Sequence, residues 1–236
     1  FEGDQMYWQT YPTPNDYDFI KNYFWLDIDY NKIRRIISKD PQVKKAMSAM
    51  PNIRILRQPF DFTVLSFILS ARNNIPAIRK SVRNLCGMLG KKLLVDDESI
   101  YLFPSTNKIA NASIERLREA KVGYKAEYLK KTAQMLIERD LSKRIYNMDE
   151  KEARTELLRL PGVGDKISDC VLVFALGFQN LTPVDVWARR FLIDLYDLPE
   201  SWNYEKLRGW IKKNFFGYAS WADQFLFEWY RKEPRK

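Results

Sequence analysis

Apolar residues recur three or four positions apart along most of this chain, the spacing of helices that bury one face. Asp29 is placed to cap the start of one predicted helix, and Gly90 to end another. Residues 103–113 lack the period and are expected to form a loop. The helical segments predicted in this way are residues 16–40 (as two stretches), 59–74, 75–90, one on each side of residues 121–128, then 150–160, 165–176, 184–195 and 219–231.

Residues 59–74, PFDFTVLSFILSARNN, are apolar on most faces of the expected helix. A helix of this kind belongs in a protein core. The polar residues at its end, Arg72, Asn73 and Asn74, would then lie at the surface, held in place by the buried part of the helix.

The first fifteen residues, FEGDQMYWQTYPTPN, follow a different pattern. Aromatic residues alternate with polar ones before two prolines, which is typical of a strand that ends at a break. We therefore expect residues 1–15 to be a remnant of an N-terminal β-rich segment and residues 16–236 to form a helical domain. The fold class predicted from the pattern is all-α, with this β remnant at the N-terminus.

The charge balance favours a polyanionic partner. The chain has 39 Lys and Arg against 30 Asp and Glu, a net charge of +9, and the basic residues are spread along its whole length. Such a distribution indicates nucleic acid before a membrane surface, and a basic protein without an anionic partner is the alternative. No apolar run approaches the ~18–20 residues that span a bilayer.

Two features of the composition narrow the chemistry. The chain has no histidine, which removes histidine general bases, Ser-His-Asp triads and most zinc sites. Its two cysteines, Cys86 and Cys170, are too few for a cysteine-ligated iron–sulfur cluster and do not indicate a disulfide framework. A reduced, intracellular setting is expected, and any catalysis has to use Lys, Asp, Glu, Tyr, Cys or the backbone.

A helix-hairpin-helix is predicted at residues 152–177, where PGVG separates two helical stretches. Gly162 and Gly164 flank Val163 and permit a tight turn with close backbone approach. Backbone N–H groups of such a turn, beside a helix N-terminus, suit a phosphate and read no base sequence. The alternative is an ordinary αα-hairpin, and the pattern alone leaves the two interpretations even.

Lys166 is an unusual residue for the first turn of the second helix. The partial positive charge of a helix N-terminus disfavours its ammonium form, and a neutral amine is a nucleophile that forms Schiff bases. The alternative is a surface lysine, the commoner case. Cys170 lies four residues further on the same helix face and is expected to pack as a small apolar residue rather than to react.

Asp185 follows Pro183 in TPVDVWARRFL, directly before a new helix. It is either the N-cap of that helix or a carboxylate brought near Lys166 after a short return of the chain. An amine nucleophile and a carboxylate beside a phosphate-binding turn suit attack at a sugar carbon next to a phosphodiester. The carboxylate would stabilise the cationic transition state.

With these motifs the sequence resembles the helix-hairpin-helix, Gly-Pro-Asp DNA glycosylases, and within them the 8-oxoguanine DNA glycosylases. Six segments occur in the family's order between Tyr23 and Phe227. The resemblance implies two helical subdomains with the active site in the cleft between them. It also implies an enzyme that extrudes oxidised guanine from duplex DNA and excises it. The six segments are YFWLDIDYNKI, IRILRQPFDFTVLSFILSARNNI, VGYKAEYL, LPGVGDKISDCVLVFAL, TPVDVWARR and GYASWADQFLF.

The resemblance also implies roles for single residues. Lys166 matches the catalytic lysine, which attacks C1′ of the sugar, expels the base and then, through a Schiff base, promotes β-elimination of the 3′ phosphate. Asp185 matches the catalytic aspartate. Cys170 and Phe227 match residues that pack against the flipped base.

Three further matches concern the duplex itself. Asn73 and Asn74 match part of a turn that enters the gap left by the extruded nucleotide, and Tyr124 matches a tyrosine wedged beside the orphaned base. Gly162, Val163 and Gly164 match the hairpin that binds the DNA backbone.

Three positions depart from the better-known eukaryotic members where those proteins contact the orphaned base. Arg72 replaces a third asparagine of the gap-filling turn, and Lys125 and Ala77 replace two arginines that read the opposite cytosine. We therefore expect a weakened preference for cytosine opposite the lesion.

Other departures lie at the base pocket. Trp187 stands where the family has a histidine, and Asp223 where a glutamine reads the Watson–Crick edge of the base. A carboxylate accepts from both N1–H and N2–H of a guanine, so Asp223 keeps recognition of that edge, and Gln224 is an alternative reader. The family's N-terminal β domain is expected to be absent or reduced to the first residues.

The expected partner is double-stranded DNA that contains oxidised guanine. The protein is expected to bind it as a monomer and to have no membrane partner. No cofactor is expected beyond a structural monovalent cation at the hairpin. The expected location is the cytoplasm and nucleoid of a prokaryote or the nucleus of a eukaryote. Two other functions remain open: a non-catalytic helix-hairpin-helix DNA-binding module, which would not need Lys166 and Asp185, and an alkylated-base glycosylase, against which Lys166 argues.

Overall fold

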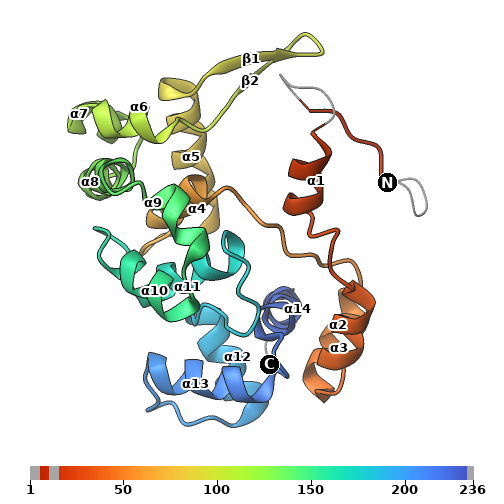
Figure 1. The fold of residues 1–236 in the computed structure, drawn as a ribbon. Helices are drawn as coiled ribbons and strands as arrows, with labels where there is room; N and C mark the ends of the chain where they lie inside the picture. Colours follow the sequence, from red (N-terminus) through yellow and green to blue (C-terminus); the bar gives the residue numbers. More distant parts are fainter. Residues whose placement is uncertain (1–5, 11–15, 233–236) are drawn as a thin grey trace.

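The structure is a computed structural model that describes residues 6–10 and 16–232 (Figure 1). Over those residues the chain forms fourteen α-helices, one 3₁₀-helix and one two-stranded sheet. The strands β1 (Lys92–Val95) and β2 (Glu98–Tyr101) pair antiparallel, with Lys92 opposite Tyr101. The helices are α1 (Tyr17–Tyr23), α2 (Tyr30–Ile37), α3 (Pro41–Ala49), α4 (Phe60–Ile68), α5 (Ile75–Leu89), α6 (Thr106–Asn111), α7 (Ile114–Glu119), α8 (Lys125–Glu138), α9 (Leu141–Arg144), η1 (Ile145–Asn147), α10 (Glu150–Leu158), α11 (Asp165–Phe174), α12 (Val186–Tyr196), α13 (Tyr204–Asn214) and α14 (Ala219–Lys232).

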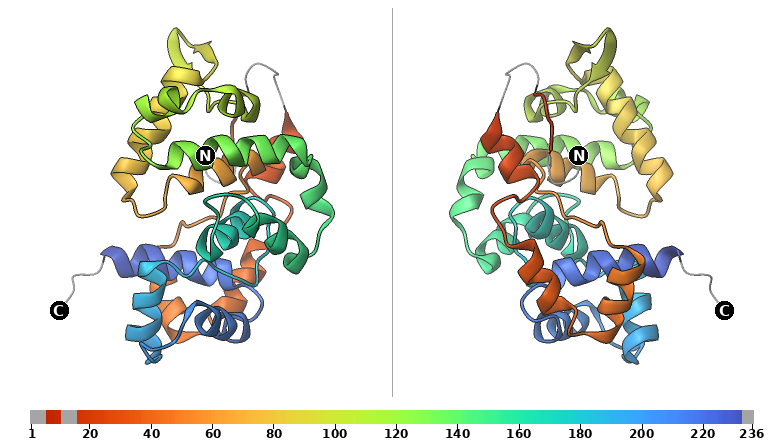
Figure 2. Two further views of the ribbon diagram at one scale, coloured as in Figure 1. Left: turned by 90° about the vertical axis from the view of Figure 1, so that its left-hand side faces the viewer. Right: turned by 90° about the vertical axis from the view of Figure 1, so that its right-hand side faces the viewer.

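The helices pack around two hydrophobic cores, which confirms the two helical subdomains. The first core is built from residues between Phe60 and Leu181, on α4 to α11 and the loops between them. The second combines residues 25–55 with residues 184–229, so that α2 and α3 pack against α14 (Figure 2). After α1, the chain therefore passes through the second subdomain, builds the first and returns to the second. Phe174, at the end of α11, packs against both cores.

Helix ends follow the capping signals of the sequence. The Asp29 side chain accepts a hydrogen bond from the Lys32 N–H at 2.8 Å, so the predicted N-cap of α2 is confirmed. Asp149 and Glu152 form a capping box at the start of α10. Gly90 ends α5, as predicted.

Two expectations about local structure were wrong, and one element was not anticipated. The helix predicted for residues 59–74 ends at Ile68, and turns follow before α5 begins; Arg72 has a left-handed backbone, with φ of 49°. The segment expected to be a loop, residues 103–113, contains α6, because the Ser105 side chain caps it and Ile109 and Ala110 are buried in the first core. The β1–β2 hairpin was not anticipated, since its residues have no strong alternation of apolar and polar positions.

The predicted β remnant lies mostly outside the described residues. The part that is described, residues 6–10, has no regular secondary structure. Among the helices of the described chain, none is both long enough and apolar enough to cross a membrane.

Candidate active site

The helix-hairpin-helix predicted at residues 152–177 is formed by α10, a tight turn and α11. Gly162 has a left-handed backbone, with φ of +82°, and an added Cβ would lie 2.9 Å from the Cβ of Tyr128. Glycine is therefore required there both by conformation and by the close approach of α8. The hydroxyl of Thr132 on α8 donates to the Pro161 carbonyl at 2.7 Å and fixes the turn from the same side.

Lys166, in the first turn of α11, is directed against the end of α4. Its Nζ lies 3.4 Å from the Ser70 hydroxyl and 5.2 Å from the centre of the Phe67 ring. Phe67 in turn stacks on Phe174, with ring centres 5.7 Å apart. The amine therefore lies between a hydroxyl and the face of an aromatic ring at the end of α4.

Asp185 is the N-cap of α12, the first of the two predicted alternatives. Its Oδ1 accepts hydrogen bonds from the Trp187 N–H at 2.8 Å and the Ala188 N–H at 2.9 Å. These bonds fix the carboxylate in one orientation. Capping does not exclude the second alternative, because Asp185 also lies near Cys170, one helical turn after Lys166 on α11.

Cys170 is 1% exposed, and burial raises the pKa of its thiol to about 12. Lys166 lowers that pKa and Asp185 raises it, so the amine and the carboxylate both lie close enough to act on the sulfur. The thiol stays protonated at neutral pH, which agrees with the expectation that Cys170 packs as a small apolar residue.

Asp223, on α14, extends this group of residues. Its side chain is 3% exposed, and burial raises the pKa of the carboxyl to about 7; Asp185 adds to the rise, while Thr182 and Gln224 oppose it. The Gln224 amide donates to Asp223 Oδ2 at 3.1 Å. Within the described residues, Asp223 Oδ1 and the buried Thr182 hydroxyl have no hydrogen-bond partner.

The two predicted aromatic residues of the pocket lie on α12 and α14. The Arg231 guanidinium lies 4.9 Å from the ring centre of Phe227, and the Arg190 guanidinium lies 5.5 Å from that of Trp187. Both rings are half-buried. Neither is sealed in the core, so each keeps a surface on which a ligand can pack.

The turn between α4 and α5 carries the predicted gap-filling residues on the surface. Arg72, Asn73 and Asn74 are all exposed. The Asn74 side chain caps α5 by accepting from the Ala77 N–H at 2.9 Å, and the Asn73 amide donates to the Leu69 carbonyl at 3.3 Å.

The start of α8 lies beside this turn. Tyr124 is 55% exposed and meets Tyr128 edge to face, with ring centres 6.0 Å apart. Lys125, next in sequence, is buried, and its Nζ donates to the Leu69 carbonyl at 2.9 Å. Burial lowers the pKa of the Lys125 amine. The start of α8 and the turn between α4 and α5 are therefore joined by hydrogen bonds to the carbonyl of Leu69.

The family to which the chain belongs follows from a match over most of its length. The family described as "HhH-GPD superfamily base excision DNA repair protein" matches residues 65–215, well over half of the chain. The chain belongs to the HhH-GPD superfamily. Residues 3–61 match a second family, "8-oxoguanine DNA glycosylase, N-terminal domain".

Relatives within the HhH-GPD superfamily support the same assignment. "N-glycosylase/DNA lyase OGG1" of Arabidopsis thaliana is 32% identical over 203 residues, covering 80% of this chain and 55% of its own. A "Probable N-glycosylase/DNA lyase" of Methanothermobacter thermautotrophicus is 26% identical over 215 residues, with coverages of 82% and 68%. The Clostridium acetobutylicum 8-oxoguanine glycosylase/lyase, solved with dsDNA containing cytosine opposite 8-oxoG, is 32% identical with a TM-score of 0.87, covering 92% of this chain and 76% of its own. The chain thus spans between about half and two thirds of the length of the curated relatives.

Sequence reasoning missed contacts made through the backbone. The Lys125 bond to Leu69 gives no pattern in the sequence, because the acceptor is a carbonyl that every residue carries. Ser70 lies shortly before the polar residues Arg72 to Asn74, but nothing in its residue type marked it as a neighbour of Lys166. Tyr204, discussed below, was also not singled out.

Proposed function

We propose that this HhH-GPD protein is a bifunctional DNA glycosylase and AP lyase that excises 8-oxoguanine from duplex DNA. The observation that carries the proposal is the placement of the Lys166 amine against the end of α4 and of the Asp185 carboxylate at the start of α12, both near the buried thiol of Cys170. A DNA-binding module would need the hairpin backbone but not this pair. The names of the relatives, N-glycosylase/DNA lyase and 8-oxoguanine glycosylase/lyase, support the same activity.

The proposed reaction begins at C1′ of the damaged nucleoside. Lys166 Nζ forms a bond to C1′ while the bond from C1′ to the base nitrogen breaks, and the base leaves with the electron pair and is protonated. Asp185 stabilises the positive charge that develops on the sugar. Ring opening gives a Schiff base; loss of a C2′ proton then expels the 3′ phosphate by β-elimination, and water releases the lysine. These steps use side chains of the chain itself and require no cofactor.

The other predicted residues take supporting roles in the proposal. Phe227 and Cys170 hold the faces of the extruded base, and Asp223 reads its Watson–Crick edge. Arg72, Asn73, Asn74 and Tyr124 occupy the distorted duplex, and the hairpin turn at 161–164 binds a phosphate.

Borohydride trapping tests the nucleophile. We expect wild-type protein to form a covalent adduct with a duplex that contains one 8-oxoguanine, because borohydride reduces the Schiff base. Lys166→Gln should form none, while Lys151→Gln, a change at an exposed lysine of α10, should trap like wild type. Duplex binding by the wild type without adduct or base release would instead support a binding module or another lesion.

A further inference from the structure

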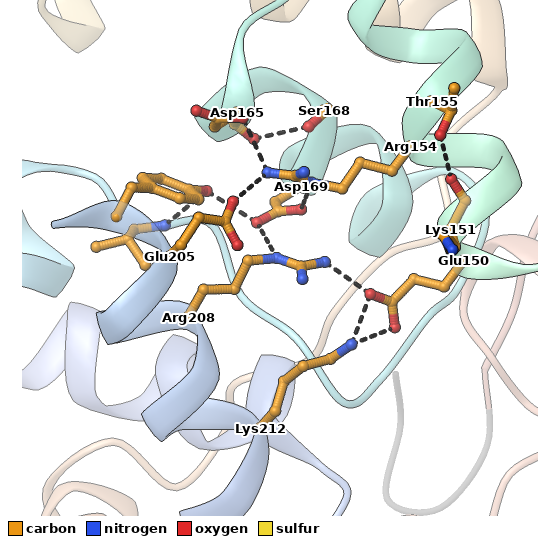
Figure 3. A network of polar contacts seen from close by, with 12 residues as sticks. Glu150, Lys151, Arg154, Thr155, Asp165, Ser168, Asp169, Glu205, Arg208 and Lys212 are labelled. Atoms are coloured by element: carbon orange, nitrogen blue, oxygen red, sulfur yellow. Dashed lines mark hydrogen bonds and ion pairs between the residues drawn. The ribbon is translucent and has the colours of Figure 1, made fainter.

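A network of charged groups, buried at its centre, joins α10, α11 and α13 (Figure 3). At its centre is Asp169, on α11, with a fully buried side chain. Arg208 Nε on α13 donates to Asp169 Oδ2 at 2.9 Å, and Arg154 Nε on α10 lies 3.6 Å from Asp169 Oδ1. Arg208 and Lys212 both reach Glu150 at the start of α10, with distances of 2.6 Å.

Tyr204 links this network to a second part of the chain. Its hydroxyl donates to Asp169 Oδ2 at 2.9 Å and accepts from the backbone N–H of Val184 at 3.3 Å. Burial raises the pKa of Tyr204, and the Asp169 carboxylate raises it further, so the phenol remains a donor. One hydroxyl therefore bridges α11 and the segment that leads into α12.

The two bridged segments are those that carry the proposed catalytic residues. Asp169 lies three residues after Lys166 on α11, and Val184 directly precedes Asp185. The first segment belongs to the first hydrophobic core and the second segment to the other core. The distance between the amine and the carboxylate is thus spanned by a hydrogen-bonded path from Asp169 through Tyr204 to Val184.

The charges around Asp169 hold that path in one orientation. Burial raises the pKa of the Asp169 carboxyl, and the Arg208 guanidinium is the strongest opposing influence. A buried ion cluster of this kind contributes little net stability compared with apolar packing. What the cluster does provide is a fixed acceptor for the Tyr204 hydroxyl.

We propose that Tyr204 is a positioning residue that sets Asp185 against Lys166. The inference rests on the proposed function. Tyr204 acts through Val184 and Asp169, and has no role as a donor or acceptor to DNA. Asp185 is needed while the bond to the base breaks and charge develops on the sugar. A preformed abasic site has already lost its base, so Schiff-base formation there needs Lys166 but much less help from Asp185.

The test compares two reactions of one variant, Tyr204→Phe, which removes the hydroxyl and keeps the ring. Single-turnover excision of 8-oxoguanine should slow by about tenfold or more, as expected when reacting groups lose their alignment. Borohydride trapping on a preformed abasic-site duplex should stay within about twofold of wild type, because Lys166 is untouched.

Tyr196→Phe is the matched control. Its hydroxyl also donates to an aspartate, Asp40 Oδ1 at 3.0 Å, but it joins α3 to the end of α12 opposite Asp185. Both variants should lose stability in thermal unfolding, because each removes a buried hydrogen bond to an aspartate, and only Tyr196→Phe should keep wild-type excision.

Three results would overturn the inference. Excision by Tyr204→Phe at the wild-type rate would remove any role in positioning, and equal losses in excision and in abasic-site trapping would leave only a structural role. Wild-type protein that traps on neither substrate would refute the proposed function, and the inference with it.

Discussion

At the scale of single residues, Asp223 is the side chain whose chemistry depends most on its surroundings. A carboxyl at this position is ordinary in sequence, but burial and the nearby Asp185 raise its pKa to about 7. The ionised form would accept two hydrogen bonds from a guanine edge, whereas the neutral form would donate one and accept one. Recognition by Asp223 therefore depends on pH in the neutral range.

We expect Asp223→Asn to change how stability depends on pH. Because burial favours the neutral acid, the folded wild type holds one more proton than the unfolded chain between its ordinary pKa of 3.8 and about 7. The free energy of unfolding of wild type relative to the variant should therefore fall as pH rises through that window, by about 4 kcal/mol at most, and level off above it. Thermal unfolding from pH 5 to pH 8 measures this. Asp96→Asn, in the exposed β1–β2 turn, should run parallel to wild type; parallel curves for Asp223→Asn would contradict the assignment.

At the scale of elements, the junction of α8 with the α4–α5 turn shows how a helix start can support a surface loop. Lys125 Nζ and the Asn73 amide both donate to the Leu69 carbonyl. The start of α8, which carries the exposed Tyr124, is thereby joined to the turn that carries the exposed Arg72 and Asn74. Lys125 is directed away from the surface on which an orphaned base would lie.

We expect Lys125→Met to weaken excision without changing the choice of opposite base. The substitution keeps the length of the side chain but leaves the Leu69 carbonyl with the weaker Asn73 bond, at a cost of about 1–2 kcal/mol. Rates opposite cytosine and adenine should fall by the same factor, measured in single turnover. Lys131→Met, at an exposed lysine of the same helix, is the control. A change in the ratio of the two rates would mean that Lys125 reads the opposite base directly.

At the scale of the whole molecule, the proposed site is assembled where the two cores meet. Lys166 comes from α11 of the first core, and Asp185, Asp223 and Phe227 come from α12 and α14 of the second. The surface proposed for the orphaned base is likewise built from distant segments, the α4–α5 turn and the start of α8. Lys125 and Ala77, the two positions expected to read the opposite base, are not arginines.

This arrangement predicts a shallow opposite-base preference. Without bidentate guanidinium groups at these two positions, discrimination has to come from weaker contacts. We expect excision of 8-oxoguanine opposite cytosine and opposite adenine to differ by less than about tenfold, or about 1.4 kcal/mol. Single-turnover rates on the two duplexes measure this, and a much steeper ratio would contradict it.

Features that depend on local spacing could be predicted from the sequence alone. The helix-hairpin-helix, the Asp29 cap and the stop at Gly90 follow from residue types a few positions apart, and such signals act within one turn of helix. The same spacing placed Lys166 and Cys170 on one helix face. It also left Asp185 with two interpretations, of which the structure shows the N-cap.

Contacts between residues far apart in the chain could be known only from the tertiary structure. Lys125 is buried against a backbone carbonyl, α6 forms because the first core receives Ile109 and Ala110, and Tyr204 joins Asp169 to Val184. These contacts link residues far apart in the chain, and several of them use backbone atoms that are the same in every residue. Such contacts follow no repeating spacing in the sequence and need no characteristic residue type. They form only when the packing of the two cores brings the distant segments together.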